Sequence, residues 1–219
     1  MKPNKFIDYS WSDDYYETPF ISKDLIKIIK NIASTNKKSY LDVGCGNGSI
    51  TKKLSHFFKK TTGIDLSSEG IEHAKKVNNT NIEFLKLDLE MLIKKKKFDF
   101  VSAIEVIEHQ YDPYLFISQL AQVTSDNGYV LISTPYHGYF KNLLIALFGK
   151  MDRHFTVLWK HGHIKFFSKK TLTELILAKN TIFGKKNLDY KFQIQNIFYS
   201  GRFFPFSRSM IFLIKKKSN

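Results

Sequence analysis

The sequence contains very little cysteine and arginine. Its single cysteine, Cys45, excludes a disulfide framework and a four-thiolate zinc site within one chain. Arginine occurs only at Arg153, Arg202 and Arg208, although lysine brings the net charge to +14. Because arginine dominates the readout of bases and phosphates, we do not expect nucleic acid as a partner despite this charge.

Long apolar runs are also missing. The longest run, at residues 143–148, falls far short of the ~20 apolar residues that a membrane-spanning helix needs. Residues 1–18 lack the apolar core of about 7–15 residues that marks a secretory signal. We therefore expect a cytoplasmic protein, and a length of 219 residues fits one α/β domain with small additions.

Patterns typical of strands and helices alternate through the first two thirds of the chain. Short apolar strands are expected at 39–43, 61–65, 82–87, 98–104 and 128–133, with helices at 21–33, 49–58, 67–77 and 113–123. This alternation predicts βαβ units and a mostly parallel sheet. Helices at 143–148 and 169–178 follow, and strands at 191–199 and 209–215 are expected to form a terminal antiparallel pair.

The strongest local signal is a glycine-rich turn at residues 41–48 (LDVGCGNG), between a strand and a helix. Glycine suits such a turn because the backbone can approach a ligand without a Cβ in the way. Asp65 ends the next strand, where a carboxylate can accept both hydroxyls of a ribose. The glycine spacing differs from that of dinucleotide sites, and no P-loop lysine follows.

These residues resemble the motifs of class I S-adenosylmethionine-dependent methyltransferases. Residues 42–48 resemble motif I, 63–67 (GIDLS) the ribose motif, and 87–89 (LDL) the motif whose acid contacts the adenine amine; 98–101 and 127–131 resemble the fourth and fifth strands. The resemblance implies a Rossmann-like α/β fold with a mostly parallel seven-stranded sheet and C-terminal antiparallel strands. It also implies S-adenosylmethionine as the cofactor, bound by Asp42, Gly44, Cys45, Gly46, Asp65, Leu66, Asp88, Leu89 and Ile104.

The resemblance divides the single domain into four parts. These are an N-terminal arm and helix (1–35), the cofactor-binding core (36–135), an insertion or lid over the acceptor site (136–168), and a C-terminal helix with edge strands (169–219). In the arm, Tyr9 and Trp11 are further cofactor candidates, because aromatic faces attract a sulfonium cation. Packing of the arm explains these aromatic residues equally well.

An acidic cluster lies just past the fourth predicted strand, at the sheet edge where ligands gather. Glu105, Glu108 and His109 are spaced i, i+3, i+4, which puts them on one side of a helical turn. Two carboxylates and an imidazole can bind Mg²⁺, Mn²⁺ or Zn²⁺. The pattern resembles the Glu-x-x-Glu-His of ubiquinone-biosynthesis O-methyltransferases and of small-RNA 2′-O-methyltransferases. Metal-free relatives share it, so a metal site and a metal-free pocket both stay open.

A second histidine group follows the insertion, and His163 is its candidate residue. It suits a metal ligand, a general base or a loop anchor. The candidate catalytic residues, which are also the candidate ligands of a divalent cation, are Glu105, Glu108, His109 and His163. The remaining histidines, His56, His73, His137 and His154, are interpreted as surface or local packing residues.

Residues 141–160 mix apolar side chains with basic ones. Such a segment can lie in a membrane interface, as its counterpart does in the ubiquinone group, or it can form a lid or a dimer contact. The expected function is methyl transfer from S-adenosylmethionine to an oxygen of a small molecule. Alternatives are a metal-independent tailoring enzyme acting on a sugar, lipid precursor or N-acceptor, an RNA methyltransferase, and a non-catalytic cofactor-binding protein.

Overall fold

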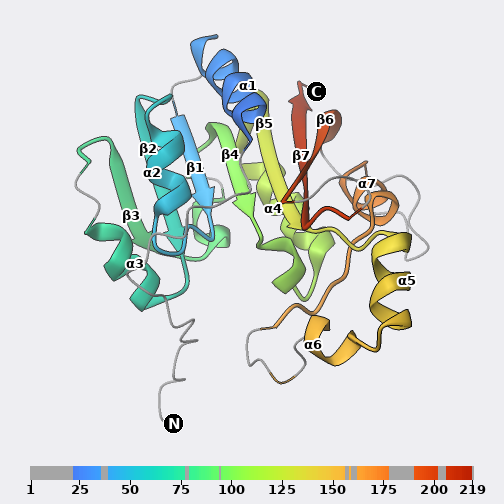
Figure 1. The fold of residues 1–219 in the computed structure, drawn as a ribbon. Coiled ribbons are helices and arrows are strands. Elements are labelled where there is room, and N and C mark those ends of the chain that lie inside the picture. The colour runs from blue at the N-terminus through green and yellow to red at the C-terminus, as the bar shows by residue number, and fades with distance from the viewer. Residues whose placement is uncertain are drawn as a thin grey trace.

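A computed structural model describes residues 22–35, 39–76, 79–93, 95–155, 158, 162–177, 190–201 and 206–218. Its centre is a seven-stranded sheet in the order β3-β2-β1-β4-β5-β7-β6 (Figure 1). The strands are β1 (Ser39–Val43), β2 (Lys60–Asp65), β3 (Ile82–Lys86), β4 (Phe98–Ile104), β5 (Thr124–Pro135), β6 (Lys191–Ser200) and β7 (Ser209–Lys217).

The sheet is parallel from β3 to β5 and antiparallel at its other edge. β1 pairs in parallel with both β2 and β4, and β4 pairs in parallel with β5. β7 then pairs antiparallel to both β5 and β6. The predicted α/β fold, with a mostly parallel seven-stranded sheet and a C-terminal antiparallel pair, is confirmed.

The helices follow the predicted order, with shifted ends. They are α1 (Lys23–Ser34), α2 (Ser49–Ser55), α3 (Ser68–Lys75), α4 (Pro113–Val123), α5 (Tyr139–Leu147), α6 (Met151–Phe155) and α7 (Lys169–Leu177), with 3-10 turns η1 (Leu89–Leu92) and η2 (Ile107–His109). Side-chain caps fix two of the starts. Ser67 accepts the N–H of Gly70 at the start of α3, and Asp112 accepts the N–H of Leu115 before α4.

Two apolar layers cover the two faces of the sheet, because successive strand residues point to opposite faces. Tyr40 of β1 packs in one layer with Leu25 of α1 and Leu54 of α2. Leu41, the next residue, packs in the other layer with side chains of α4 and α7, including Leu120 and Leu172. This packing leaves the carboxyl ends of β1, β2 and β4 together at one edge of the sheet.

The insertion differs from this core. α5 begins at Tyr139, earlier than the predicted 143, directly after the extended Gly138. α5 contains no buried residue, and it lies with α6 beyond the edge where β1 and β4 end (Figure 1). Among the described residues, no helix has the length and apolar character that a membrane crossing requires.

Candidate active site

A tight loop of residues 44–48 follows β1 and leads into α2. Gly44, Gly46 and Gly48 have φ angles of +70°, +51° and +78°, in the left-handed region that favours glycine. A Cβ on Gly44 would lie only 2.5 Å from Cγ2 of Val106, in the turn after β4. Glycine at position 44 thus lets the loop backbone lie against the end of β4. Because these glycines have no side chains, a ligand at this edge can also approach the loop backbone closely.

Asp65 ends β2 beside this loop. One carboxylate oxygen accepts the N–H of Gly46 at 2.8 Å, and the other accepts the N–H of Ser67 at 2.7 Å. Burial raises the pKa of Asp65, and these backbone N–H groups oppose the rise. A carboxylate has about four lone-pair sites, so acceptor capacity is left for two ribose hydroxyls. With the adjacent side chain of Leu66 exposed, this geometry fits the adenosine part of S-adenosylmethionine.

Asp42 and Cys45 lie beneath the loop rather than on its open side. Asp42 is 2% exposed, and its two oxygens accept the hydroxyls of Thr51 and Ser102. Cys45 is buried and packs with Phe84 under α3. Burial raises the pKa of the Cys45 thiol, and the Asp42 carboxylate raises it further, so the thiol is neutral. Both side chains therefore support the loop from below. The spacing of residues in the sequence motif does not distinguish this role from direct contact with the cofactor.

The other cofactor candidates are spread along the same edge. Asp88 is exposed and caps η1 by accepting the N–H of Glu90 at 3.0 Å, while Leu89 is buried beneath it. Ile104 is buried at the end of β4. Tyr9 and Trp11 lie outside the described residues.

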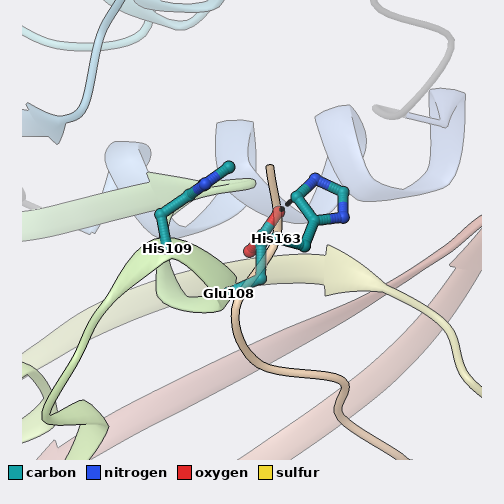
Figure 2. Close-up of side chains that lie close together, drawn as sticks. All are labelled: Glu108, His109 and His163. Carbon is teal, nitrogen blue, oxygen red and sulfur yellow. Dashed lines mark ion pairs between the residues drawn. The ribbon is translucent and has the colours of Figure 1, made fainter. Parts of the chain in front are cut away.

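Three of the four candidate acceptor-site residues come together (Figure 2). Glu108 and His109 belong to η2, and His163 belongs to the segment 162–168 that follows the insertion. One potential ligand atom from each lies within 4.8 Å of those of the others. His163 Nε2 is 4.0 Å from Glu108 Oε1, and the rings of His109 and His163 meet edge to face at 4.9 Å.

Backbone hydrogen bonds hold the two segments of this group together. The N–H groups of Ile164 and Lys165 both donate to the carbonyl of Glu108 at 3.0 Å. Segment 162–168 is therefore fixed against η2 by the residue that also offers its carboxylate to the site. This attachment places His163 although it lies 55 positions beyond Glu108 in the chain.

Glu108 is the most unusual group of the site. It is 0% exposed, and among the described residues only the Thr134 hydroxyl and the residue's own backbone N–H act on its carboxylate, neither of them with good hydrogen-bond geometry. Burial raises the pKa of Glu108 well above its usual range, and the carboxylate of Glu105 raises it further. Burial also lowers the pKa of His163 to about 4, with a contribution from His109, which keeps the imidazole neutral. A buried carboxylate with unused oxygens beside two imidazoles fits a divalent cation.

Comparison with known proteins identifies the family of this chain. The family described as methyltransferase domain matches residues 18–180. A ubiquinone biosynthesis O-methyltransferase of Pelagibacter ubique is 31% identical over 179 residues, which cover 76% of this chain and 72% of that protein. A protein of the same name from Hydrogenovibrio crunogenus is 28% identical over 153 residues, which cover 67% and 63%. The chain belongs to this methyltransferase family.

Solved structures share the fold of this methyltransferase. The N-methyltransferase NodS from Bradyrhizobium japonicum, in complex with S-adenosylhomocysteine, has a TM-score of 0.62 and 12% identity, and the match covers 92% of this chain and 90% of that one. The magnesium protoporphyrin IX methyltransferase ChlM from Synechocystis, with S-adenosylhomocysteine bound, has a TM-score of 0.61 and 16% identity, over 88% and 83%. The predicted family, fold class and cofactor are confirmed.

Glu105 lies outside the group of three, contrary to the expectation from i, i+3, i+4 spacing. Its φ is +55°, and η2 begins only at Ile107, so no regular helical turn connects it with Glu108. Its carboxylate accepts the hydroxyl of Ser133 on β5 at 2.6 Å and that of Ser209 on β7 at 3.4 Å. Burial raises the pKa of Glu105 to about 7, and these hydroxyls oppose the rise.

Sequence reasoning missed two histidines of the insertion region of this methyltransferase. His137 is only 9% exposed, and neither ring nitrogen has a hydrogen-bond partner among the described residues. Its ring lies against those of His154, Phe155 and Phe166, with centroids 5.6, 6.2 and 5.1 Å away. Their burial depends on how α6 packs against residues 162–168, which the sequence does not reveal. The aromatic residues of the insertion were the only local hint that a packed cluster forms there.

Proposed function

We propose that this methyltransferase transfers the methyl group of S-adenosylmethionine to an oxygen atom of a small molecule. The observation that carries the proposal is the buried Glu108, grouped with His109 and His163 just past β4. The same turn contains Val106, which lies directly against the position of Gly44 in the cofactor loop. Acceptor and cofactor would therefore meet at one edge. The relatives named ubiquinone biosynthesis O-methyltransferase support oxygen as the methylated atom.

In this proposal the cofactor is held by the backbone of Gly44 and Gly46 and by the carboxylate of Asp65. Leu66, Leu89 and Asp88 lie along the same edge and would line the adenine side. The sulfonium is already a strong electrophile, so the protein mainly positions the reactants and excludes water.

Transfer of a methyl group to a hydroxyl oxygen releases the hydroxyl proton. The group that accepts this proton must be unprotonated before the reaction. His163 meets this requirement, because burial lowers its pKa to about 4. Glu108 lies beside it, with Oε1 4.0 Å from Nε2. We therefore assign the acceptor hydroxyl to the space between these two side chains.

A divalent cation is the second part of the proposal. Glu108, His109 and His163 would hold it, and the cation would then replace proton uptake by His163, because a coordinated nitrogen has no free lone pair. Glu105 accepts the hydroxyl of Ser133 and would not be a ligand. A cation in such a site lowers the pKa of an acceptor hydroxyl and orients it. Carboxylate and imidazole together suit Mn²⁺ or Zn²⁺ better than Ca²⁺, which prefers ligands that are all oxygen.

The test uses an acceptor that offers oxygen and nitrogen in one molecule. Dopamine carries a catechol and an amine, and mass spectrometry of its methylated product shows which atom was modified. We expect methylation of a catechol oxygen, stimulated by Mn²⁺, suppressed by a chelator and lost in Glu108→Gln. Glu90→Gln, on exposed η1, should retain activity. Methylation of the amine, or no transfer to dopamine and other catechols by protein that binds the cofactor, would contradict the acceptor assignment.

The insertion carries a proposal about a further partner. The segment 141–160 would contact an anionic membrane surface through α5, where Leu147 is 71% exposed and Phe148 is also exposed. Lys150 lies over the ring of Phe148 at 5.8 Å, so a basic group accompanies the apolar face.

Flotation with vesicles of anionic phospholipid tests this contact. Leu147→Asp is expected to reduce the bound fraction severalfold, whereas Met91→Asp, an exposed apolar residue on η1, should bind as the wild type does. Equal binding by both variants would assign the apolar face of α5 to a lid or to a contact between copies instead.

A further inference from the structure

A buried polar network lies beneath the cofactor loop. Thr51 Oγ1 donates to one carboxylate oxygen of Asp42 at 2.5 Å, and Ser102 Oγ donates to the other at 2.5 Å. The hydroxyl of Tyr40 lies 2.7 Å from Ser102 Oγ. All four residues are buried, so none of these hydrogen bonds is replaced by water if it is lost.

The network connects both ends of the loop with the neighbouring strand. Asp42 lies two residues before Gly44, where the loop begins, and Thr51 lies in the first turn of α2, where the loop has just ended. Ser102 is the residue of β4 that stands directly beside Asp42 in the parallel pairing. One carboxylate therefore ties the entry and the exit of the loop to the strand that leads to the acceptor site.

We propose that Thr51 and Ser102 are positioning residues for the cofactor, which act through Asp42 by fixing the loop of residues 44–48. This inference rests on the proposed function for the identity of the ligand. Neither hydroxyl is expected to touch the cofactor. Each contributes by holding one oxygen of Asp42, so that the backbone of Gly44 and Gly46 is already in its binding conformation before the ligand arrives.

The charge of Asp42 gives this role a measurable signature. Burial raises the pKa of Asp42 to about 6, while the hydroxyls of Ser102, Thr51 and Tyr40 oppose the rise and the nearby Asp65 adds to it. Cys45 and Tyr40 are the other titratable groups that face Asp42, and burial raises the pKa of both, so that they stay neutral. When Asp42 takes up a proton, one of its oxygens becomes a donor, so one hydroxyl must turn round to accept and both hydrogen bonds lose their charge assistance.

Affinity and stability therefore respond to pH in opposite directions. A folded-state pKa above the ordinary 3.8 means that the folded chain binds this proton more tightly than the unfolded chain does. The contribution of Asp42 to stability is thus fully present below the ordinary pKa and is lost as pH rises to about 6. Cofactor affinity should instead fall as pH drops below about 6. Because His137 and His163 lose stability over the same range, circular dichroism at each pH must show that the protein is folded.

The experiment measures S-adenosylhomocysteine binding by calorimetry from pH 5 to 8. Thr51→Val keeps the shape and removes the hydroxyl, and we expect roughly tenfold weaker binding at pH 7.5, because the ligand must then order a loop that is no longer fixed in advance. The pH midpoint of binding should also move upward, since one group that keeps Asp42 charged is gone. Ser102→Ala should act in the same way, while Thr51→Ser should bind within about twofold of the wild type.

Thr61→Val is a matched control. Thr61 is a buried threonine of β2 whose hydroxyl has no hydrogen-bond partner among the described residues, so its replacement removes a buried hydroxyl and no bond. The inference is overturned if folded Thr51→Val and Ser102→Ala bind with the affinity and pH midpoint of the wild type. Failure of the wild type to bind S-adenosylhomocysteine would instead contradict the proposed function.

Discussion

The buried carboxylates differ between the two halves of the site: the cofactor half, around residues 42–66, and the acceptor half, which comprises residues 105–109 and the insertion with segment 162–168. In the cofactor half, the carboxylates of Asp42 and Asp65 each accept two hydrogen bonds from the chain itself. In the acceptor half, Glu108 is fully buried and its oxygens accept none from the described residues, and the nitrogens of His137 are equally unpartnered there. Glu105, also in the acceptor half, accepts the hydroxyls of Ser133 and Ser209, so the contrast rests on Glu108. We propose that Glu108 is arranged for a group that the chain does not supply.

The largest effect is expected from glycines with the same strain in the two halves. Gly44 and Gly149 both have positive φ, but a Cβ on Gly44 meets Val106, while a Cβ on Gly149 meets nothing within 4 Å. Gly149→Ala should lose about 1–2 kcal/mol of unfolding free energy because of the backbone conformation, and Gly44→Ala should lose more because its Cβ also meets Val106. Only Gly44→Ala should also lose more than about 100-fold in S-adenosylhomocysteine affinity, measured by calorimetry. Equal losses of affinity would remove the distinction between the halves.

A smaller effect is expected from Asp65→Asn. An amide offers one acceptor oxygen where the carboxylate accepts Gly46 and Ser67 with two. The amide would also replace a charged acceptor of the ribose hydroxyls by a neutral one. Hydrogen bonds to charged groups contribute about 1.5–3 kcal/mol, so affinity should fall roughly 10- to 100-fold in the same titration. Glu72→Gln, on the exposed side of α3, serves as the control. An Asp65→Asn variant with wild-type affinity would show that the loop does not depend on this carboxylate.

The smallest effect concerns His137, which should be replaceable. Burial lowers the pKa of His137 to about 4, and Lys141 and the neighbouring histidines lower it further. The unfolded chain therefore binds this proton more readily, so stability is lost as pH falls from about 6.5 toward 4.

His137→Phe removes both unpartnered nitrogens from an aromatic environment. It should raise the unfolding free energy in urea by about 1 kcal/mol at pH 7.5, and by more at pH 5.5. His56→Phe, at an exposed position, should change neither value. A destabilised His137→Phe would mean that these nitrogens bind a group that the folded chain needs.

Much of the cofactor half could be predicted because its signals are local. Glycines at fixed spacing, an acid at the end of the next strand and alternating apolar patterns place residues 39–104 in order. Even there, the burial of Asp42 was not predictable, because it depends on Ser102, sixty positions away, in the neighbouring strand. The position of Asp65 beside the loop follows from parallel pairing of β1 and β2.

The acceptor half was predicted less well, and the reason is conformational. Helical spacing placed Glu105 with Glu108, but the positive φ of Glu105 turns its carboxylate toward Ser133 instead. His154 packs locally against Phe155, as interpreted, whereas the burial of His137 depends on how the insertion folds back on 162–168. Long-range packing of this kind leaves no periodic pattern in the sequence.

The most direct test of the difference between the halves is calorimetry on the wild type and Glu108→Gln, with S-adenosylhomocysteine and Mn²⁺ titrated separately. If the cofactor half is complete and the acceptor half awaits a cation, both proteins will bind S-adenosylhomocysteine with the same affinity without metal. Only the wild type will then bind Mn²⁺. Absence of Mn²⁺ binding to the wild type, or S-adenosylhomocysteine binding that requires Mn²⁺, would contradict the account.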